Sequence, residues 1–290
     1  MAREIAFLTN PTSGRGRGAR YGAVAAARLR DSGLVVRNLQ GRDADEAQDL
    51  ARASVADGVD AIVVCGGDGL VHLATQVVAT TGIPLGIIPA GSGNDVARYF
   101  DLPRKDPVAA ADRVIASRLR RIDLARAGSR YYVTVLAAGF DAVVNERANT
   151  LAWPRGQMRY TVATLAELRT FRPLAFTLDL DGAPLRVDAM LVAVGNGRSY
   201  GGGLRITEGA VLDDGLLDVV IIKEMTKTKL IRTYPKLFSG THVAVAEYVH
   251  HRVRSVTVAA PGVVSYADGE RFGKLPLTVT CEPGALAVYA

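Results

Sequence analysis

The first 125 residues alternate short apolar runs with longer stretches in which apolar positions recur every three or four residues. The runs predict strands, and the longer stretches predict helices that pack on them through one apolar face. The predicted strands cover 5–9, 34–39, 59–65 and 84–88. The first predicted helix ends near residue 32, and two further helices cover 43–57 and 70–80. This alternation indicates a three-layer α/β domain with a mostly parallel sheet.

Beyond residue 125 the pattern changes to successive strands with few helices between them. Asp181-Gly182 is typical of a two-residue hairpin turn. Strands are predicted over 131–138, 174–181, 183–194, 219–222, 253–259, 263–266, 277–280 and 285–289, and helices near 142–149, 157–170 and 226–238. The sequence therefore predicts two domains: residues 1–124 form an N-terminal α/β domain, and residues 125–290 form a C-terminal β-rich domain with inserted helices.

Composition narrows the class of partner. The 290 residues carry 35 basic and 29 acidic side chains, a net charge of +6, which favours anionic partners such as nucleotide phosphates or an acidic membrane surface. No helix-turn-helix or zinc-finger spacing occurs, so a nucleic-acid partner is not predicted. Two distant cysteines form no disulfide framework, and neither a signal-peptide core nor an apolar run of about 18 residues is present. We therefore expect a cytoplasmic location.

The segment Gly66-Gly67-Asp68-Gly69 follows the apolar run at 59–65. Glycines let backbone N–H groups approach a phosphate closely, and an aspartate among them favours an intervening cation such as Mg²⁺. The alternative is a tight strand-to-helix turn. Glycine-containing loops at 10–18 and 89–95 follow two further strands, and ligands bind at the edge of an α/β sheet where the carboxyl ends of its strands meet.

Several acids add to this picture. Asp68, Asp95 and Asp123 are each expected at or just after the carboxyl end of a strand, where clustered carboxylates require cations or protons between them. The alternative for each is a helix cap. Asp214 and Glu270 lie in turn-like segments of the second domain, and each is compatible with a plain hairpin turn or with a functional carboxylate.

Three common nucleotide and hydrolase motifs do not fit. Gly273-Lys274 is followed by Leu275, so it is not a Walker A loop, and Gly91-Ser92-Gly93 follows the fourth strand and lacks the spacing of a dinucleotide fingerprint. There is no Gly-x-Ser-x-Gly elbow. The four histidines have no metal-ligand spacing with the cysteines.

Seven segments occur in an order that resembles the soluble diacylglycerol kinase family, in particular its actinobacterial lipid kinases, which also carry stretches like 147–149 and 153–156. They are Asn10-Pro11-x-Ser13-Gly14, Gly66-Gly67-Asp68-Gly69, Pro89-x-Gly91-Ser92-Gly93-Asn94-Asp95, Gly139-Phe140-Asp141, Tyr200-Gly201-Gly202-Gly203, Asp214-Gly215-Leu216-Leu217-Asp218 and Asp268-Gly269-Glu270. The resemblance runs essentially end to end.

The resemblance implies an ATP-dependent kinase that phosphorylates the free hydroxyl of diacylglycerol to give phosphatidic acid. It implies that residues 1–124 form a nucleotide-binding domain similar to phosphofructokinase and NAD kinase, that residues 125–290 form a C-terminal β-sandwich that binds lipid and metal, and that ATP lies between them. Carried over by position, the ATP-binding residues are Asn10, Pro11, Thr12, Ser13, Gly14, Gln40, Gly66, Gly67, Asp68, Gly69, Leu70, Val71, His72 and Ser92. The Mg²⁺ ligands are Val211, Asp214 and Leu216, the general base is Glu270, and Asp68, Asp95 and Asp123 communicate with the metal region through waters.

The sequence departs from the family pattern after the glycine loop, where threonine and asparagine or glutamate are common and this chain has Leu70 and His72. Two alternatives therefore stay open: a kinase for another lipid alcohol, such as a sphingoid base or ceramide, and a non-catalytic lipid- or nucleotide-binding pseudo-kinase. A bilayer substrate implies peripheral contact with the inner face of an anionic membrane, for which basic residues at 223–236 are candidates. A homodimer is an expectation of the family resemblance.

Overall fold

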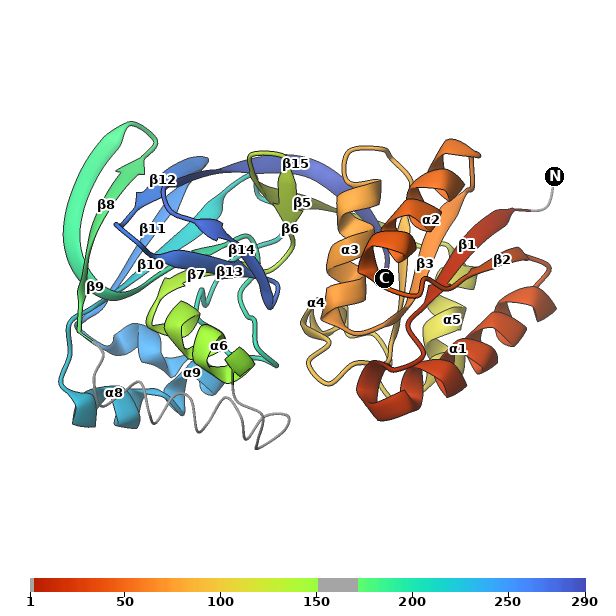
Figure 1. The fold of residues 1–290 in the computed structure, drawn as a ribbon, viewed down its shortest axis with the longest axis horizontal. Coiled ribbons are helices and arrows are strands. Elements are labelled where there is room, and N and C mark those ends of the chain that lie inside the picture. The colour runs from red at the N-terminus through yellow and green to blue at the C-terminus, as the bar shows by residue number, and fades with distance from the viewer. Residues whose placement is uncertain (1–2, 151–171) are drawn as a thin grey trace.

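The computed structural model describes residues 3–150 and 172–290, so the predicted helix over 157–170 and the stretch 153–156 lie outside the described residues. Two lobes lie side by side in Figure 1, the N-terminal half at the right and the C-terminal half at the left. Strands β5 (Leu119–Ala127) and β15 (Leu277–Tyr289) run along the top from one lobe towards the other. The two lobes therefore share continuous β-structure.

Four parallel strands in the order β2-β1-β3-β4 form the sheet of the N-terminal lobe. They are β1 (Glu4–Thr9), β2 (Val35–Leu39), β3 (Ala61–Gly66) and β4 (Leu85–Pro89), close to the predicted bounds. Every residue of β3 and β4 is buried. Continuous apolar strands of this kind are typical of a parallel sheet with helices on both faces.

Helices α1 and α5 pack on one face of this sheet, and α2 and α3 pack on the other. The bounds are α1 (Ser13–Asp31), α2 (Ala44–Ala56), α3 (Asp68–Val78), the short α4 (Asp95–Tyr99) and α5 (Pro107–Ala116). The Asp43 carboxylate caps α2 by accepting the Glu46 N–H at 2.9 Å, and Asp106 caps α5 in the same way. The predicted three-layer α/β arrangement is confirmed.

The C-terminal lobe is built from antiparallel strands. They are β6 (Arg130–Tyr132), β7 (Val135–Gly139), β8 (Leu174–Leu180), β9 (Ala183–Gly195), β10 (Leu217–Lys223), β11 (Tyr248–Val253), β12 (Ser255–Ala259), β13 (Val264–Ala267) and β14 (Glu270–Lys274). Side chains from β8 and β12, such as Phe176 and Val258, share one buried core with Val192 of β9 and Val219 of β10. This shared core confirms the predicted β-sandwich.

Helices cover the other face of β9 and β10 and lie below the strands in Figure 1. They are α6 (Phe140–Thr150), α8 (Lys227–Thr233), α9 (Lys236–Ser239) and the 3₁₀ helix η1 (Thr241–Ala244). The single helix predicted over 226–238 is wrong, because the structure has two short helices there. Pro235 has no N–H, so the backbone hydrogen bond that would continue the helix after Tyr234 is missing, although both residues keep right-handed helical backbone angles.

The strand predicted over 131–138 is also interrupted. Strand β6 ends at Tyr132 and β7 begins at Val135. The N–H groups of Val133 and Thr134 donate instead to the side chain of Asp268, at 3.1 and 2.9 Å. The Asp268 carboxylate takes the place of a strand partner at this point.

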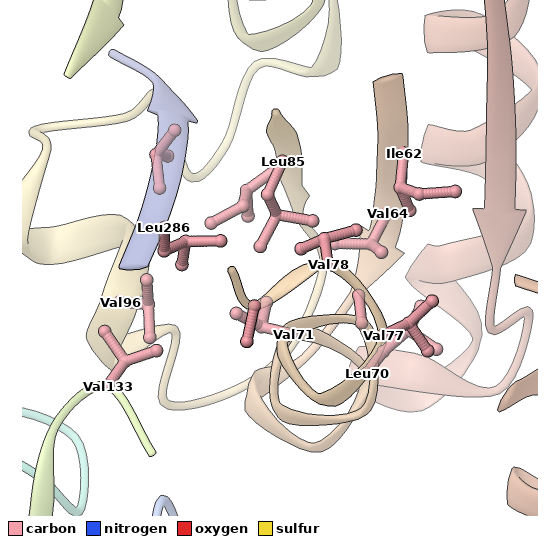
Figure 2. Close-up of a cluster of buried hydrophobic side chains, with 14 of the residues drawn as sticks. Ile62, Val64, Leu70, Val71, Val77, Val78, Leu85, Val96, Val133 and Leu286 are labelled. Atoms are coloured by element: carbon pink, nitrogen blue, oxygen red, sulfur yellow. The ribbon is translucent and has the colours of Figure 1, made fainter. Parts of the chain in front are cut away.

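The final strand joins the two lobes. The strands predicted over 277–280 and 285–289 form one strand, β15, with an irregularity between Glu282 and Leu286. Its end pairs in parallel with β4 through Val288 and Leu85. Figure 2 shows Leu286, together with Val133, among side chains of the N-terminal lobe such as Val71. The division between residues 124 and 125 stays a prediction.

Candidate active site

Three loops meet at the carboxyl ends of β1, β3 and β4, as the sequence predicts. The N–H of Asn10 donates to the carbonyl of Cys65 at 3.0 Å, which holds the first loop against the second. The N–H groups of Ala90 and Gly91 both donate to the carbonyl of Gly66, at 2.8 and 3.1 Å, which holds the third loop against the second. Backbone contacts therefore fix all three loops at one edge of the sheet.

Two glycines are required by the close approach of these loops. A Cβ atom on Gly91 would lie 2.4 Å from the Cα atom of Gly67. A Cβ atom on Gly14, which has a φ of +59°, would lie 1.9 Å from the carbonyl oxygen of Ala90. Since real side chains essentially never approach backbone this closely, the loops can pack only with glycine at both positions.

The Asp68 carboxylate links the second loop to the third. It accepts the N–H groups of Asn94 and Asp95 at 2.7 and 2.6 Å. Burial, followed by the nearby charge of Asp95, raises the pKa of Asp68 to about 6. This carboxylate therefore positions the third loop against the glycine loop, and its raised pKa brings it close to protonation near neutral pH.

Asp95 makes the next connection, from the third loop to the C-terminal lobe. Its carboxylate accepts the Gly202 N–H at 2.8 Å, and the guanidinium of Arg98 lies 4.0 Å away. Burial raises the pKa of Asp95, and the hydrogen bond from Gly202 opposes this rise. The sequence prediction that Asp68 and Asp95 converge is thus confirmed by their hydrogen bonds and mutual charge.

Asp123 does not lie where the sequence predicts. It occupies the middle of the antiparallel strand β5 and not the carboxyl end of a parallel strand. Its carboxylate accepts the N–H groups of Gly215 and Gly284, at 2.7 and 2.8 Å. Gly284 lies within the irregular part of β15, between Glu282 and Leu286, where the register of the pairing with β5 shifts. Asp123 thus anchors the turn that follows Asp214.

A buried pair links the glycine loop to the opposite lobe. The Nδ1 atom of His72 lies 3.1 Å from Oδ2 of Asp268. The other carboxylate oxygen of Asp268, Oδ1, accepts the Thr134 hydroxyl at 2.6 Å. Burial alone would raise the pKa of Asp268, but the hydrogen bond and charge of His72 and the hydrogen bonds from Thr134 and Val133 hold this pKa below its usual range. Sequence reasoning gave Asp268 no role of its own, although its place in the Asp268-Gly269-Glu270 segment was a signal.

Glu270 lies directly after the same turn. A Cβ atom placed on Gly69 would lie 3.0 Å from Oε1 of Glu270, so this carboxylate faces the start of α3. The N-terminus of a helix attracts anions, because its first N–H groups have no acceptor within the helix. Glu270 and a phosphate at Gly69 would therefore be neighbours.

A cleft of about 660 Å³ lies between these groups, and both lobes contribute to its wall. Arg42, Arg130 and Arg271 contribute cationic side chains, which sequence analysis did not single out. The predicted nucleotide-binding residues in the wall are Asn10, Pro11, Thr12, Ser13, Gly67, Gly69, Leu70 and His72, and the predicted base Glu270 joins them. Asp43, Asp45 and Glu270 also line the cleft and balance the three arginines, so it is the volume of the cleft that suits a nucleotide.

The other predicted nucleotide-binding residues lie elsewhere. Val71 is buried in the hydrophobic core of the N-terminal lobe. Ser92 and Gln40 are exposed, and neither contributes to the wall of the cleft, although Gly41 does. Gly14 and Gly66 act through the loop packing described above. The nucleotide roles of these residues stay predictions.

The segment proposed to bind magnesium precedes β10. The segment forms successive turns. It is not the tip of a hairpin, because no strand lies directly before it to pair with β10. The carbonyls of Val211 and Leu216 and the carboxylate of Asp214 are hard oxygen donors of the type that Mg²⁺ prefers. However, the guanidinium of Arg252 is ion-paired with Asp214, whose other oxygen accepts the Leu216 N–H at 3.1 Å. A divalent ion at this position would compete with Arg252.

The described residues contain no group of three or more His, Cys, Asp or Glu side chains that could hold a metal ion. Magnesium at Asp214 would therefore rely on one carboxylate, backbone carbonyls and water. This donor set fits a weakly held Mg²⁺, which commonly keeps several of its waters.

Solved structures with the same two-lobed fold are known. The structure resembles an NAD kinase from Archaeoglobus fulgidus in complex with ATP, with a TM-score of 0.54 and 14% identity over 99% of this chain and 93% of that one. It resembles a putative diacylglycerol kinase from Bacillus anthracis str. Sterne with a TM-score of 0.79 and 20% identity, over 99% and 96% of the two chains. The fold is that of these two-lobed kinases.

The sequence comparisons give the family. Residues 4–127 match the diacylglycerol kinase catalytic domain, and residues 134–290 match the YegS C-terminal NAD kinase beta sandwich-like domain. A diacylglycerol kinase of Mycobacterium tuberculosis is 47% identical over 98% of this chain and 94% of its own length. One from Bacillus subtilis is 27% identical over 93% and 90%. The chain belongs to the diacylglycerol kinase family of bacterial lipid kinases.

Proposed function

We propose that this chain transfers the γ-phosphoryl group of ATP to the free hydroxyl of diacylglycerol and releases phosphatidic acid and ADP. The observation that carries the proposal is the position of Glu270, whose carboxylate faces Gly69 at the start of α3 across the cleft. A proton acceptor beside a phosphate-binding helix terminus has the geometry that phosphoryl transfer to an alcohol requires.

In this mechanism the ATP phosphates lie against Gly67, Gly69 and the loop at Asn10. The acceptor oxygen attacks the γ-phosphorus, its proton passes to Glu270, and the bond between the γ-phosphorus and the oxygen bridging to the β-phosphate breaks as ADP leaves. Arg42, Arg130 and Arg271 offset phosphate charge from the cleft wall. Magnesium, when bound, neutralises further phosphate charge.

Asp68 and Asp95 do not contact the reacting atoms in this mechanism, and they act by positioning the loops. Through their hydrogen bonds they connect the glycine loop, the third loop and the turn at Gly202. We propose that they hold both lobes in register around the nucleotide. A site with fixed geometry lowers the entropic cost of bringing the hydroxyl to the phosphorus.

There are two alternatives to this function. Relatives of the chain include probable YegS-like lipid kinases, for example one from Pseudomonas fluorescens that is 30% identical over 85% of this chain. One alternative is phosphorylation of another lipid alcohol, such as a sphingoid base or ceramide. The other is nucleotide binding without turnover, which the aliphatic side chain of Leu70 in the cleft wall favours, since it offers no hydroxyl to a phosphate.

The test is a panel of hydroxyl acceptors with ³²P-labelled ATP and purified protein, with and without Mg²⁺. We expect Mg²⁺-dependent label in phosphatidic acid from dioleoylglycerol, and much less label from sphingosine, ceramide or glycerol. Label in a sphingoid product would favour the first alternative. Nucleotide binding with no labelled product from any acceptor would favour the second.

For membrane contact we propose the α8 and α9 region. Arg232 and Lys236 are exposed there, whereas Lys229 is ion-paired with Glu247 at 2.6 Å. Basic side chains near an anionic leaflet contribute about 1 kcal/mol each. No helix within residues 3–150 and 172–290 is long and apolar enough to cross a membrane. Sedimentation with phosphatidylglycerol vesicles at low and high salt tests the proposed contact.

A further inference from the structure

A second pocket, apart from the nucleotide cleft, lies at the junction of the two lobes. It measures about 360 Å³ and shares no wall residue with the cleft. Its wall consists of Arg98, Asp101, Leu102, Arg104, Arg198, Ser199, Gly203 and Arg205. Four of these residues are arginines and one is an aspartate, so positive charge exceeds negative charge in the wall by three.

Both lobes contribute arginines to this pocket. In the N-terminal lobe, Arg98 lies in α4 and Arg104 lies in the loop that follows it. In the C-terminal lobe, Arg198 and Arg205 lie on either side of the glycine turn at 201–203. Figure 1 shows α4 on the side of the N-terminal lobe that faces the other lobe. An anion in the pocket would therefore contact both lobes at once.

Contacts between the lobes fix the backbone around the pocket. The Tyr99 hydroxyl donates to the carbonyl of Ser199 at 2.8 Å and accepts the N–H of the same residue at 2.5 Å. The N–H of Gly202 donates to the Asp95 carboxylate at 2.8 Å. The segments that carry the arginines are thus held in place before a ligand arrives, which lowers the entropic cost of binding.

Two of the arginines are already held by neighbouring groups. The Nε–H of Arg98 donates to the carbonyl of Gly93 at 3.1 Å, and this guanidinium lies 4.0 Å from Asp95. The guanidinium of Arg205 is ion-paired with Glu208. The side chains of Arg98 and Arg205 are 35% and 34% exposed, respectively. These contacts fix two guanidinium groups in the wall and offset part of their charge.

The other two arginines have no anionic partner in the part of the chain that the structure describes. Arg104 and Arg198 are exposed, and neither forms an ion pair or a side-chain hydrogen bond with a residue in 3–150 or 172–290. The Arg198 guanidinium lies over the ring of Tyr99, 5.9 Å from its centroid, which keeps it at the lobe junction. The charges of Arg104 and Arg198 are therefore available to a ligand.

The chemistry of this wall favours a phosphate monoester. A guanidinium presents paired N–H donors that match two oxygens of a phosphate group. A phosphate monoester offers three such oxygens and carries close to two negative charges at neutral pH. A carboxylate has one charge and two oxygens, so it would leave more of the wall unbalanced. The volume of the pocket accommodates a phosphate group together with the alcohol to which it is attached.

The pocket also borders α9. The backbone N–H of Arg205 donates to the carbonyl of Leu237 in α9 at 2.8 Å. This helix belongs to the region that we propose for membrane contact, and its Lys236 is exposed. The phosphate group of a lipid and a free phosphate ester can therefore both reach the pocket.

We propose that this pocket binds a phosphate monoester through Arg104 of the N-terminal lobe and Arg198 of the C-terminal lobe, and that the bound anion strengthens the contact between the lobes. The binding does not depend on the proposed function, because no residue of the pocket lines the nucleotide cleft. A chain that binds the anion but phosphorylates no lipid alcohol would keep this site and lose only the proposed function.

The test is equilibrium dialysis of the purified chain with ³²P-labelled inorganic phosphate, with a saturating non-hydrolysable ATP analogue that occupies the nucleotide cleft. Arg104→Gln, Arg198→Gln and the double variant remove the charges. Arg198→Lys keeps its charge but loses the paired donors. Arg30→Gln is a matched control that removes an exposed arginine on α1, outside the pocket. Circular dichroism confirms that each variant is folded.

We expect saturable phosphate binding to the wild type and to Arg30→Gln. Binding should be about tenfold weaker for each single glutamine variant and about threefold weaker for Arg198→Lys, and the double variant should show no saturable binding. Phosphate should raise the melting temperature of the wild type and not that of the double variant. Equal phosphate affinity of the folded double variant and Arg30→Gln would overturn the proposal. Absence of saturable binding to the wild type would overturn it equally.

Two further ligands distinguish the sources of the phosphate group. Displacement of labelled phosphate by glycerol 3-phosphate would indicate a free phosphate ester. Vesicles that contain phosphatidic acid, compared with phosphatidylglycerol vesicles of equal charge, test a lipid source by sedimentation. A preference for phosphatidic acid in the wild type that is lost in the double variant would indicate the lipid. Neither displacement nor such a preference would overturn the assignment to a phosphate monoester.

Discussion

His72 and Asp268 lie 196 positions apart in the chain, yet their side chains are 3.1 Å from each other in the buried region between the two lobes. Through this pair the helix after the glycine loop holds the turn that carries Glu270. Position 72, where the sequence departs from the family pattern, therefore has a structural role in this chain. The same pair gives the first prediction.

Replacing His72 by Phe should lower the free energy of unfolding by about 3 kcal/mol, because it leaves the buried Asp268 carboxylate without one of its donors. Urea unfolding measures the change. The control is a double-mutant cycle with Asp268→Asn, a background in which His72→Phe should cost clearly less. Equal costs in both backgrounds would show that the two side chains are not coupled.

Glu270→Gln should lower kcat by about 10² to 10⁴ and leave the KM for ATP nearly unchanged, since the amide keeps the size of the side chain but cannot accept the hydroxyl proton. Initial rates with dioleoylglycerol and ATP measure both constants. Glu282→Gln is a matched control, because Glu282 pairs with Arg126 outside the cleft. Near-normal turnover of Glu270→Gln would remove the proposed base.

Gly14→Ala should be far more damaging than Gly16→Ala. Both glycines have a positive φ, +59° and +88°, so both substitutions carry backbone strain of about 1 kcal/mol. Only at Gly14 would the new Cβ meet the Ala90 carbonyl, whereas nothing lies within 4 Å of it at Gly16. We expect weaker ATP binding and lower stability for Gly14→Ala alone, measured by calorimetry and urea unfolding. Similar losses in both variants would contradict the packing argument.

Stability should depend on pH through Asp68. Burial and Asp95 raise its folded-state pKa to about 6, above the value near 3.9 expected in the unfolded chain. The folded state therefore holds an extra proton between about pH 4 and 6, and its contribution to stability is lost as the pH rises through this window. The change is on the order of 3 kcal/mol.

The measurement is urea unfolding from pH 4.5 to 7.5 for the wild type and Asp68→Asn. An asparagine does not titrate, so the difference in unfolding free energy between the two proteins should vary with pH in the stated direction. A difference that stays constant across this range would show that the pKa of Asp68 is the same in both states.

Arg252→Gln should increase the thermal stabilisation that Mg²⁺ provides, because it removes the cation that is ion-paired with Asp214. Asp214→Asn should abolish that stabilisation. Differential scanning fluorimetry over a MgCl₂ series measures both effects, with Arg126→Gln as a control for the loss of one surface arginine. If Asp214→Asn responds to Mg²⁺ like the wild type, Mg²⁺ does not bind at Asp214.

The sequence by itself determined the N-terminal sheet and its loops. Short, continuous apolar runs that alternate with helical patterns predict buried parallel strands, and the glycine-containing loops that follow β1, β3 and β4 marked the edge where the loops meet. The sequence also predicted the hairpin turn at Asp181-Gly182. Both residues have a positive φ in the structure, as a two-residue hairpin turn requires.

Only the tertiary structure decided the contacts between distant segments. Asp123 looked like another strand-end acid, but it lies within β5, where its carboxylate accepts the N–H groups of Gly215 and Gly284. Asp268 looked like part of a turn, yet it replaces a strand partner for Val133 and Thr134 and binds His72. A sequence pattern reports the period and burial of one element at a time, whereas these carboxylates obtain their partners from segments that are far apart in the chain and meet only in the folded protein.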